Sequence, residues 1–310
     1  MEIAVVIEGI GPDRLSMQPW FYFQERLSSD GIQIRAFQAM DPVVFERPYD
    51  AMMVYAWQDW RNRQLFNPYR IMPLMEKMAI YRSAFPQTIQ IILNHTDMSR
   101  RPYATPYWRF GDPVLYRTPA YDRRELAPFP ADSIWPFECV WGHAAYSSSD
   151  SVKYKAGFIG TPSGEQGYRD RVACFTNKVG IGRCSRKHRY SNKRHDHIMS
   201  RCQIIVCPRG WGEQSRRHWD AWLSGKPVLT DRDCDSAEMI PGLRLHEGEH
   251  YLVFEEPEQI PDLVREWTDP SRIGELEQIG RNGREAALSY DAYGRIRDFF
   301  TSLKSRLIQS

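Results

Sequence analysis

The chain has 310 residues, which is enough for about two domains of average size. Apolar residues make up 42% and charged residues 26% of it, as in an ordinary globular protein. The formal net charge is only +2, and no apolar stretch approaches the roughly 18 residues of a membrane span, which argues against a membrane-spanning protein.

The first residues, MEIAVVIEG, lack the basic lead and the cleavage site of a secretory signal and are typical of a buried strand. Six cysteines are spread along the chain, too few and too scattered for a disulfide framework. We therefore expect reduced thiols and a cytoplasmic protein.

Strands and helices alternate in the first half of the chain. Apolar runs that predict strands are separated by segments with a helical period. From residue 100 to about residue 149 the pattern dissolves into sequence rich in proline and aromatic residues. The predicted strands cover residues 2–9, 32–38, 49–57 and 88–97, and the predicted helices cover residues 19–31 and 69–85.

A second alternation follows a plausible linker at residues 146–151. Its strands and helices again follow one another as in βαβ units, which favours a parallel sheet. The predicted strands cover residues 154–161, 179–182, 202–208 and 226–231, and the predicted helices cover residues 167–178, 194–201, 218–225, 260–269, 271–288 and 292–308.

Two successive alternations predict an α/β protein with two Rossmann-like, doubly wound domains that face a cleft. We expect an N-terminal, acceptor-side domain over residues 1–150 and a C-terminal nucleotide-binding domain over residues 151–290. The last segment, residues 291–310, is expected to be a helix that can pack back on the N-terminal domain.

One segment of the second half, CPRGWGEQSRRHWDAWLSGKPVLTD, places a glycine-rich turn between a predicted strand and a predicted helix. Gly210 and Gly212 allow the backbone to turn sharply and to approach a ligand closely. Ser215 and the N-terminus of the following helix offer hydrogen-bond donors to an anion. Parallel sheets bind ligands at the carboxyl ends of their strands, where this turn is predicted to lie.

Charged residues follow the turn at helical spacing. Arg216 or Arg217 can bind a phosphate through two parallel hydrogen bonds. Asp220 lies one helical turn beyond Arg217, where a carboxylate can accept hydrogen bonds from ribose hydroxyls. A nucleoside diphosphate fits this combination of groups.

The pattern PRGxGxxSxRxxDAxxxGxPV over residues 208–228 resembles the donor-binding motif of GT-B glycosyltransferases, closest to the exostosin-like and CgeB-like groups. The segments KAGFIGT, GEHYLVFEEPEQIPDLVREWTD and IGRNGREAAL are also similar to such donor domains. The resemblance covers residues 155–288 and departs from the family in having Asp220 where glutamate is usual. It also lacks a glutamate eight residues earlier, at Gly212, so retaining or inverting stereochemistry stays open.

The resemblance implies transfer of a sugar from a nucleoside-diphosphate sugar, with UDP-sugar as the expected donor, to an acceptor hydroxyl. It also implies that no metal and no further cofactor is needed, because the helix dipole and arginines hold the diphosphate. The expected donor-binding residues are Gly160, Arg169, Gly210, Gly212, Ser215, Arg217 and Asp220.

An inverting transfer needs a base that takes the proton of the acceptor hydroxyl. Asp97 lies at the end of a predicted strand of the N-terminal half and is our first candidate. Asp13 and His95 are rival candidates.

Residues 182–201 carry seven Lys or Arg and one Asp, so this stretch is strongly basic although the net charge of the whole chain is small. A local basic patch favours a polyanionic partner, although a solvated loop is an equally ordinary explanation. With the aromatic residues of the first half, the patch makes DNA with a hydroxymethylated base a candidate acceptor. The candidate polyanion-binding residues are Arg183, Arg186, Lys187, Arg189, Lys193 and Arg194.

Other functions remain open at this point. The acceptor can equally be a carbohydrate, a lipid or a protein. A non-catalytic nucleotide-sugar or nucleic-acid binding protein and a nucleotide-sugar epimerase have compatible sequences. Sugar transfer or hydrolysis of a nucleotide sugar would exclude the first of these, and interconversion of free nucleotide sugars would indicate the second.

Overall fold

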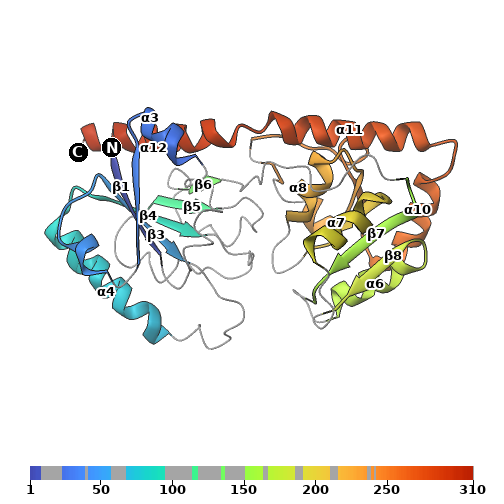
Figure 1. The fold of residues 1–310 in the computed structure, drawn as a ribbon, viewed down its shortest axis with the longest axis horizontal. Helices are drawn as coiled ribbons and strands as arrows, with labels where there is room; N and C mark the ends of the chain where they lie inside the picture. The colour runs from blue at the N-terminus through green and yellow to red at the C-terminus, as the bar shows by residue number, and fades with distance from the viewer. Residues whose placement is uncertain are drawn as a thin grey trace.

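A computed structural model describes residues 1–7, 23–38, 41–56, 68–94, 114–117, 134–136, 151–162, 167–185, 191–209, 216–235, 239–240 and 242–309. The chain forms two α/β bodies, each built on its own parallel sheet (Figure 1). The predicted fold class, two doubly wound domains, is confirmed. We call the two bodies the N-terminal and the C-terminal domain.

The N-terminal sheet has six strands in the order β2-β1-β3-β4-β5-β6, and all its pairings are parallel. The chain enters at β1 and the strand order reverses beside it, which is the doubly wound topology. The strands are β1 Glu2–Ile7, β2 Gln33–Gln38, β3 Ala51–Ala56, β4 Ile89–Asn94, β5 Val114–Arg117 and β6 Ile134–Pro136. The connecting elements include α3 Gln24–Ser29, the short 3-10 helix η1 Pro42–Phe45 and α4 Pro68–Ala84.

The C-terminal sheet has five parallel strands in the order β11-β10-β9-β7-β8. Its strands are β7 Tyr154–Gly160, β8 Ile181–Cys184, β9 Cys202–Cys207, β10 Val228–Asp231 and β11 Leu252–Phe254. Its helices are α6 Tyr168–Asn177, α7 Asn192–Ser200, α8 Arg216–Leu223, α9 Arg232–Asp235, α10 Ile260–Trp267 and α11 Ile273–Ser289, with the 3-10 helix η5 Pro257–Gln259 before α10.

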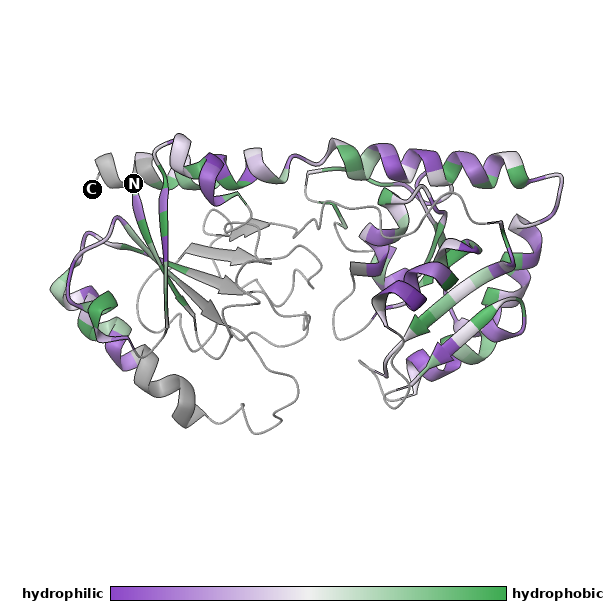
Figure 2. Cartoon of the chain, viewed as in Figure 1, coloured by the Kyte–Doolittle hydropathy of each residue, from purple (hydrophilic) through white to green (hydrophobic). Residues whose placement is uncertain are grey.

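Strand β9 shows why its sequence is a continuous apolar run. Ile204 and Val206 pack on one face of the sheet, and Ile205 and Cys207 pack on the other. All four side chains are fully buried. A strand covered on both faces has no position for a polar side chain, which is the pattern that the sequence predicted. Figure 2 shows the same contrast between apolar strands and the more hydrophilic helix α7.

The expectations for three segments need correction. No strand was predicted within residues 100–149, where the alternating pattern dissolves, but they contain β5 and β6. The strand predicted at 179–182 lies two residues later, in β8. Strand β11 was not predicted.

The last helix, α12 Ala292–Gln309, leaves the C-terminal domain and packs on the N-terminal one (Figure 1). Its apolar side chains join the same core as strands β1, β2 and β3. The Tyr293 hydroxyl also donates a hydrogen bond to the Arg26 carbonyl in α3. The α12 residues in this core are Tyr293, Ile296, Phe299, Phe300 and Leu303.

Helix α11 lies against α8 at unusually short range. A side chain at Gly280 would place its Cβ 2.5 Å from the carbonyl oxygen of Gly225, so only glycine fits there. Gly225 ends α8 with a φ of 67°, a left-handed conformation that favours glycine. The two glycines together bring α8, the helix that carries the motif, against the long α11.

None of the helices in the described ranges combines the length and the apolar character needed to cross a membrane.

Candidate donor site

The predicted donor-binding residues that the structure describes gather at the carboxyl ends of β7 and β9. These strands are neighbours, and β8 lies on the other side of β7, so the strand order reverses at this point. Such a switch point is where doubly wound sheets hold ligands. Gly160 is the last residue of β7, and α8 begins shortly after β9 ends at Cys207.

Arg217, in the first turn of α8, reaches across to the end of β7. Its Nη2 donates a 2.8 Å hydrogen bond to the Ile159 carbonyl, and its guanidinium carbon lies 4.9 Å from the centre of the Phe158 ring. Its Nε is buried and has no hydrogen-bond partner. A buried donor without a partner costs free energy, so an acceptor arriving at this place would be stabilised.

Gly160 leaves room for this arginine. A Cβ on Gly160 would lie 3.3 Å from Arg217 Nη2 and 2.8 Å from the Phe158 ring. The place of Gly160 in the site is therefore explained by close packing beside Arg217.

Asp220 lies one turn after Arg217 on α8, and only 9% of its surface is exposed. The adjacent Trp219 and Trp222 are buried in the core between α8 and α11. Burial raises the pKa of the Cys207 thiol, at the end of β9, to about 12, so this thiol stays neutral beside Arg217 and Asp220. Arg217 and Asp220 are thus two charged side chains that α8 places near Cys207, at this end of the sheet.

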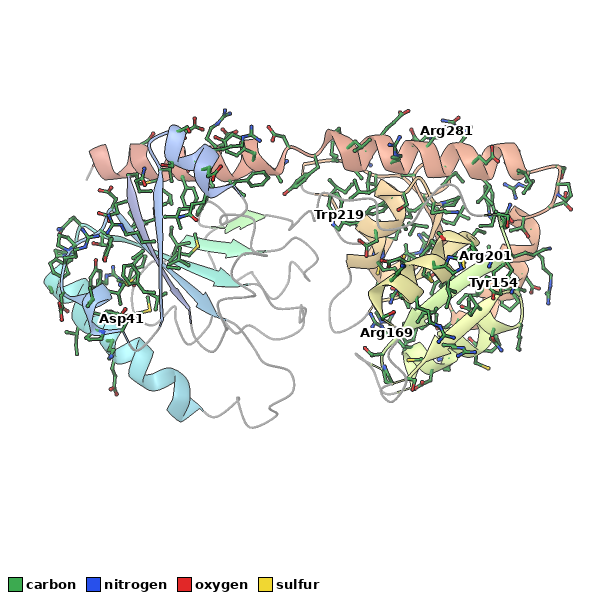
Figure 3. All side chains as sticks on the ribbon, viewed as in Figure 1. Asp41, Tyr154, Arg169, Arg201, Trp219 and Arg281 are labelled. Carbon is green, nitrogen blue, oxygen red and sulfur yellow. The ribbon has the colours of Figure 1, made fainter. Side chains whose placement is uncertain are left out.

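Arg169 does not present a free guanidinium. It is 8% exposed, and its nitrogens donate to backbone carbonyls on both sides of the switch point: Nε to Arg209 at 2.8 Å, Nη2 to Pro208 at 3.4 Å and Nη1 to Thr161 at 3.4 Å. Figure 3 shows Arg169 on the side of the C-terminal domain that faces the N-terminal domain. The sequence predicted a phosphate ligand at this position, and the observed contacts are with the protein's own backbone.

Asp231, which the sequence did not single out, holds the same backbone from the opposite side. It is the last residue of β10 and is completely buried. Its Oδ2 accepts a 2.5 Å hydrogen bond from the Arg209 N–H, and its Oδ1 accepts one from the Cys234 N–H at 3.2 Å. Burial raises the pKa of the Asp231 carboxyl, whereas these hydrogen bonds act to lower it. An acid at the end of an otherwise apolar strand is the signal that could have indicated it.

The side chain of Arg209 is held by two further residues, Tyr168 and Asp233. The Arg209 guanidinium lies 4.1 Å from the centre of the Tyr168 ring and pairs with Asp233 at 2.7 Å. The Tyr168 hydroxyl is buried without a hydrogen-bond partner, and burial raises its pKa. Arg209 is thus fixed through both its backbone and its side chain.

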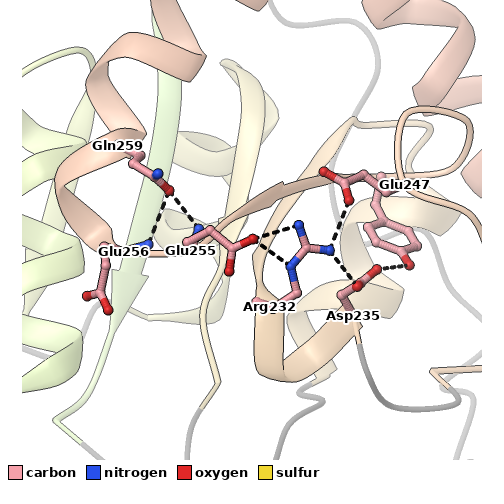
Figure 4. A network of polar contacts seen from close by, with 7 residues as sticks. Arg232, Asp235, Glu247, Glu255, Glu256 and Gln259 are labelled. Carbon is pink, nitrogen blue, oxygen red and sulfur yellow. Dashed lines mark hydrogen bonds and ion pairs between the residues drawn. The ribbon is translucent and has the colours of Figure 1, made fainter.

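A network of ion pairs follows along the sheet edge (Figure 4). Arg232 contacts Asp235 at 2.7 Å, Glu247 at 3.0 Å and Glu255 at 2.8 Å. The Tyr251 hydroxyl donates to Asp235 at 2.6 Å. These carboxylates are paired with Arg232, so the network joins α9 to the segments before and after β11.

Many predicted site residues lie outside the described residues. These are the three candidate bases Asp13, His95 and Asp97, the turn residues Gly210, Gly212 and Ser215, and the basic residues Arg186, Lys187 and Arg189. Among the other basic candidates, Arg183, Lys193 and Arg194 are exposed. Within the described ranges, no group of three or more His, Cys, Asp or Glu side chains is placed to hold a metal ion.

Residues 151–301, just under half of the chain, match the model of a family described as glycosyl transferase-like. The match spans the C-terminal domain and the first part of α12. No curated protein sequence matches the chain.

Solved structures share the fold over nearly the whole chain. HepE from Anabaena in complex with UDP and glucose is 11% identical, with a TM-score of 0.60, and covers 98% of this chain and 100% of its own. Sucrose-phosphate synthase from Thermosynechococcus elongatus is 10% identical, with a TM-score of 0.57, and covers 100% of this chain and 99% of its own. An alpha-glucosyltransferase in complex with UDP is 9% identical, with a TM-score of 0.59, and covers 98% and 100%. The fold of the whole chain is that of GT-B glycosyltransferases.

Proposed function

We propose that the protein is a glycosyltransferase that takes its sugar from a UDP-sugar bound at the carboxyl ends of β7 and β9. The observation that carries the proposal is the buried Nε of Arg217, which has no hydrogen-bond partner beside the start of α8. A diphosphate oxygen would satisfy this donor, and the dipole of α8 favours negative charge there. Asp220 is proposed to accept hydrogen bonds from the ribose.

Two further findings support this donor. The domain that holds Arg217 is glycosyl transferase-like, and similar structures were solved in complex with UDP or UDP-glucose. The relation to the exostosin-like and CgeB-like groups stays a prediction of the motif.

Replacing Arg217 with alanine, or Asp220 with alanine, should weaken binding of UDP-glucose by about 1.5–3 kcal/mol, because each change removes a hydrogen bond to or from a charged group. Isothermal titration calorimetry measures the affinity, and circular dichroism checks that the variants are folded.

Arg171→Ala is the matched control, since this arginine lies on α6 with its side chain exposed and paired with Glu256 and Glu258. Its affinity should equal that of the unchanged protein. Unchanged affinity in both the Arg217 and the Asp220 variants would reject the donor site. Binding of UDP-glucose without transfer of its sugar to an acceptor or to water would identify a binding protein, and interconversion of nucleotide sugars would identify an epimerase.

For the acceptor we propose a polyanion, namely DNA that presents a hydroxyl on a modified base. The basic segment, residues 182–201, leaves β8 at the end of the sheet where the donor is proposed to bind. There the Ser185 N–H donates to the carbonyl of Gly160, the last residue of β7, at 3.1 Å. The exposed Lys193 and Arg194 of the same segment lie in the first turn of α7. Positive charge at this edge can hold a phosphate backbone while one hydroxyl reaches the donor.

Affinity for duplex DNA should fall steeply with salt, with a slope of log K against log salt of roughly −3 to −4 for about four phosphate contacts. Filter binding over a salt series measures the slope. Replacing five basic residues with serine should make this slope less steep and leave UDP-glucose binding unchanged. These positions are Arg186, Lys187, Arg189, Lys193 and Arg194.

Absence of any duplex or single-strand binding at about 50 mM salt, where phosphate contacts are strongest, would reject DNA as the acceptor. It would leave the proposed donor untouched and direct the search to carbohydrate, lipid and protein acceptors.

A further inference from the structure

The backbone of Pro208 and Arg209 is held from two directions where the chain leaves β9. Arg169 on α6 donates to both carbonyls, and Asp231 at the end of β10 accepts from the Arg209 N–H. These contacts come from the two sides of β9, since β7 with its helix α6 lies on one side and β10 on the other. The next residue of the chain is Gly210, the first glycine of the motif.

We propose that Arg169 and Asp231 are positioning residues that fix Pro208 and Arg209 and thereby set the place from which the donor-binding turn starts. The proposal rests on the proposed donor site. Neither side chain touches the nucleotide sugar. Each acts on the donor through the backbone of Pro208 and Arg209.

The geometry of Arg169 favours this role over direct binding of phosphate. Its Nε and both Nη atoms donate to carbonyl oxygens, and the guanidinium also ties Thr161, after β7, to the segment after β9. Beyond the ends of the strands these carbonyls have left the sheet ladder, so a side chain must satisfy them when they are buried. A lysine has a single nitrogen and cannot reach three carbonyls in this planar arrangement.

Asp231 is equally unsuited to contact a ligand, because it is completely buried and both its carboxylate oxygens already accept backbone N–H groups. Asp231 instead fixes the backbone N–H of Arg209, the residue directly before Gly210. Because the backbone of Arg209 is fixed, the chain that continues into Gly210 starts from one conformation, which lowers the entropy lost when the donor binds. The Tyr168 ring under the Arg209 guanidinium restrains the side chain of the same residue.

Arg169→Lys and Asp231→Asn should each weaken UDP-glucose binding roughly tenfold, because lysine cannot serve all three carbonyls and asparagine has one acceptor oxygen for the two N–H groups, of Arg209 and Cys234, that Asp231 holds. Calorimetry measures the affinity and urea unfolding the stability. Arg171→Lys is the matched control on α6 and should change the affinity less than about twofold, as its exposed pairs contribute little.

The double variant separates positioning from direct contact. If both residues act through the same backbone segment, Arg169→Lys combined with Asp231→Asn should bind UDP-glucose only about as weakly as the weaker single variant. Two independent ligand contacts would instead multiply the two losses. Multiplied losses, or unchanged affinity in both single variants, overturn the proposal.

The pH profile supplies a readout that general loss of stability would not give. The groups that face the Asp231 carboxyl are Arg209 and Cys207 from β9 and its end, Tyr168 from α6, and Asp233 and Cys234 from α9. An ionised Asp231 accepts the Arg209 N–H, whereas protonation removes acceptor capacity. UDP-glucose affinity should therefore fall as the pH drops through the raised pKa of Asp231, and Asp231→Asn should lack this fall.

Asp233→Asn is the control for the pH profile, because it removes a carboxylate from the Arg209 guanidinium and leaves the backbone hydrogen bond in place. It should keep the acid loss of affinity. If Arg169→Lys does not fold, the profiles of Asp231→Asn and Asp233→Asn decide, and an acid loss that persists in Asp231→Asn overturns the proposal. Arg217→Ala is measured alongside, to separate failure of the positioning role from failure of the proposed donor site. Unchanged UDP-glucose binding in Arg217→Ala rejects the donor site itself.

Discussion

Replacing Phe299 with alanine should lower the free energy of unfolding by about 3–5 kcal/mol, the cost of removing a buried aromatic side chain. Phe299 is 1% exposed and packs in the core of the N-terminal domain, although it lies on α12, after the whole C-terminal domain in sequence. Urea unfolding followed by circular dichroism measures the loss. Hydrogen exchange should show that protection falls in β1, β2 and β3 and not in β7 and β9.

Thr301→Ala on the same helix is the control for Phe299→Ala, since Thr301 is exposed and its replacement should change the stability by less than about 0.5 kcal/mol. A loss below about 1 kcal/mol for Phe299→Ala, or loss of protection in the C-terminal sheet instead, would show that α12 does not form part of the N-terminal core.

The second large effect is expected at the residue that we propose as the catalytic base. Asp97→Asn should reduce turnover on the order of 100-fold or more and leave UDP-glucose affinity nearly unchanged, because a base acts in the transition state rather than in donor binding. Release of UDP from UDP-glucose, with water and then with candidate acceptors, measures the turnover. Asp97 lies outside the described residues, so this prediction comes from its place after the predicted strand that is observed as β4.

Asp13→Asn and His95→Gln test the two rival bases in the same assay. Turnover close to that of the unchanged protein in the Asp97 variant would remove Asp97 from the candidates. The rival whose replacement abolishes turnover at constant donor affinity would take its role.

The sequence predicted the elements that local patterns determine. The run Ile204–Cys207 predicted a strand buried on both faces, and the spacing of Arg217 and Asp220 predicted one face of a helix. Strands β5 and β6 were missed, because short strands in segments rich in proline carry too few residues to show a period. Strand β8 is also short, and the glycines at 180 and 182 interrupt its apolar pattern, so its predicted position was two residues too early.

The contacts that shape the candidate site were harder to predict, because they join residues distant in sequence. Arg169 has the charge of a phosphate ligand, and only the fold shows that carbonyls 39 and 40 residues away occupy its nitrogens. Asp231 looked like the end of a strand, and its bond to Arg209 spans 22 residues. A side chain's chemical type is visible in the sequence, whereas its partner depends on which strands become neighbours.

The path of α12 has a consequence for the order in which the protein can fold during synthesis. Residues 151–289 contain every strand of the C-terminal sheet and the helices that cover it, so this domain can close as soon as α11 leaves the ribosome. The N-terminal strands emerge first but lack part of their core until α12 has been made. Apolar surface of the N-terminal strands therefore stays exposed while the C-terminal domain is being synthesised. In this interval the nascent chain has the greatest need of a chaperone.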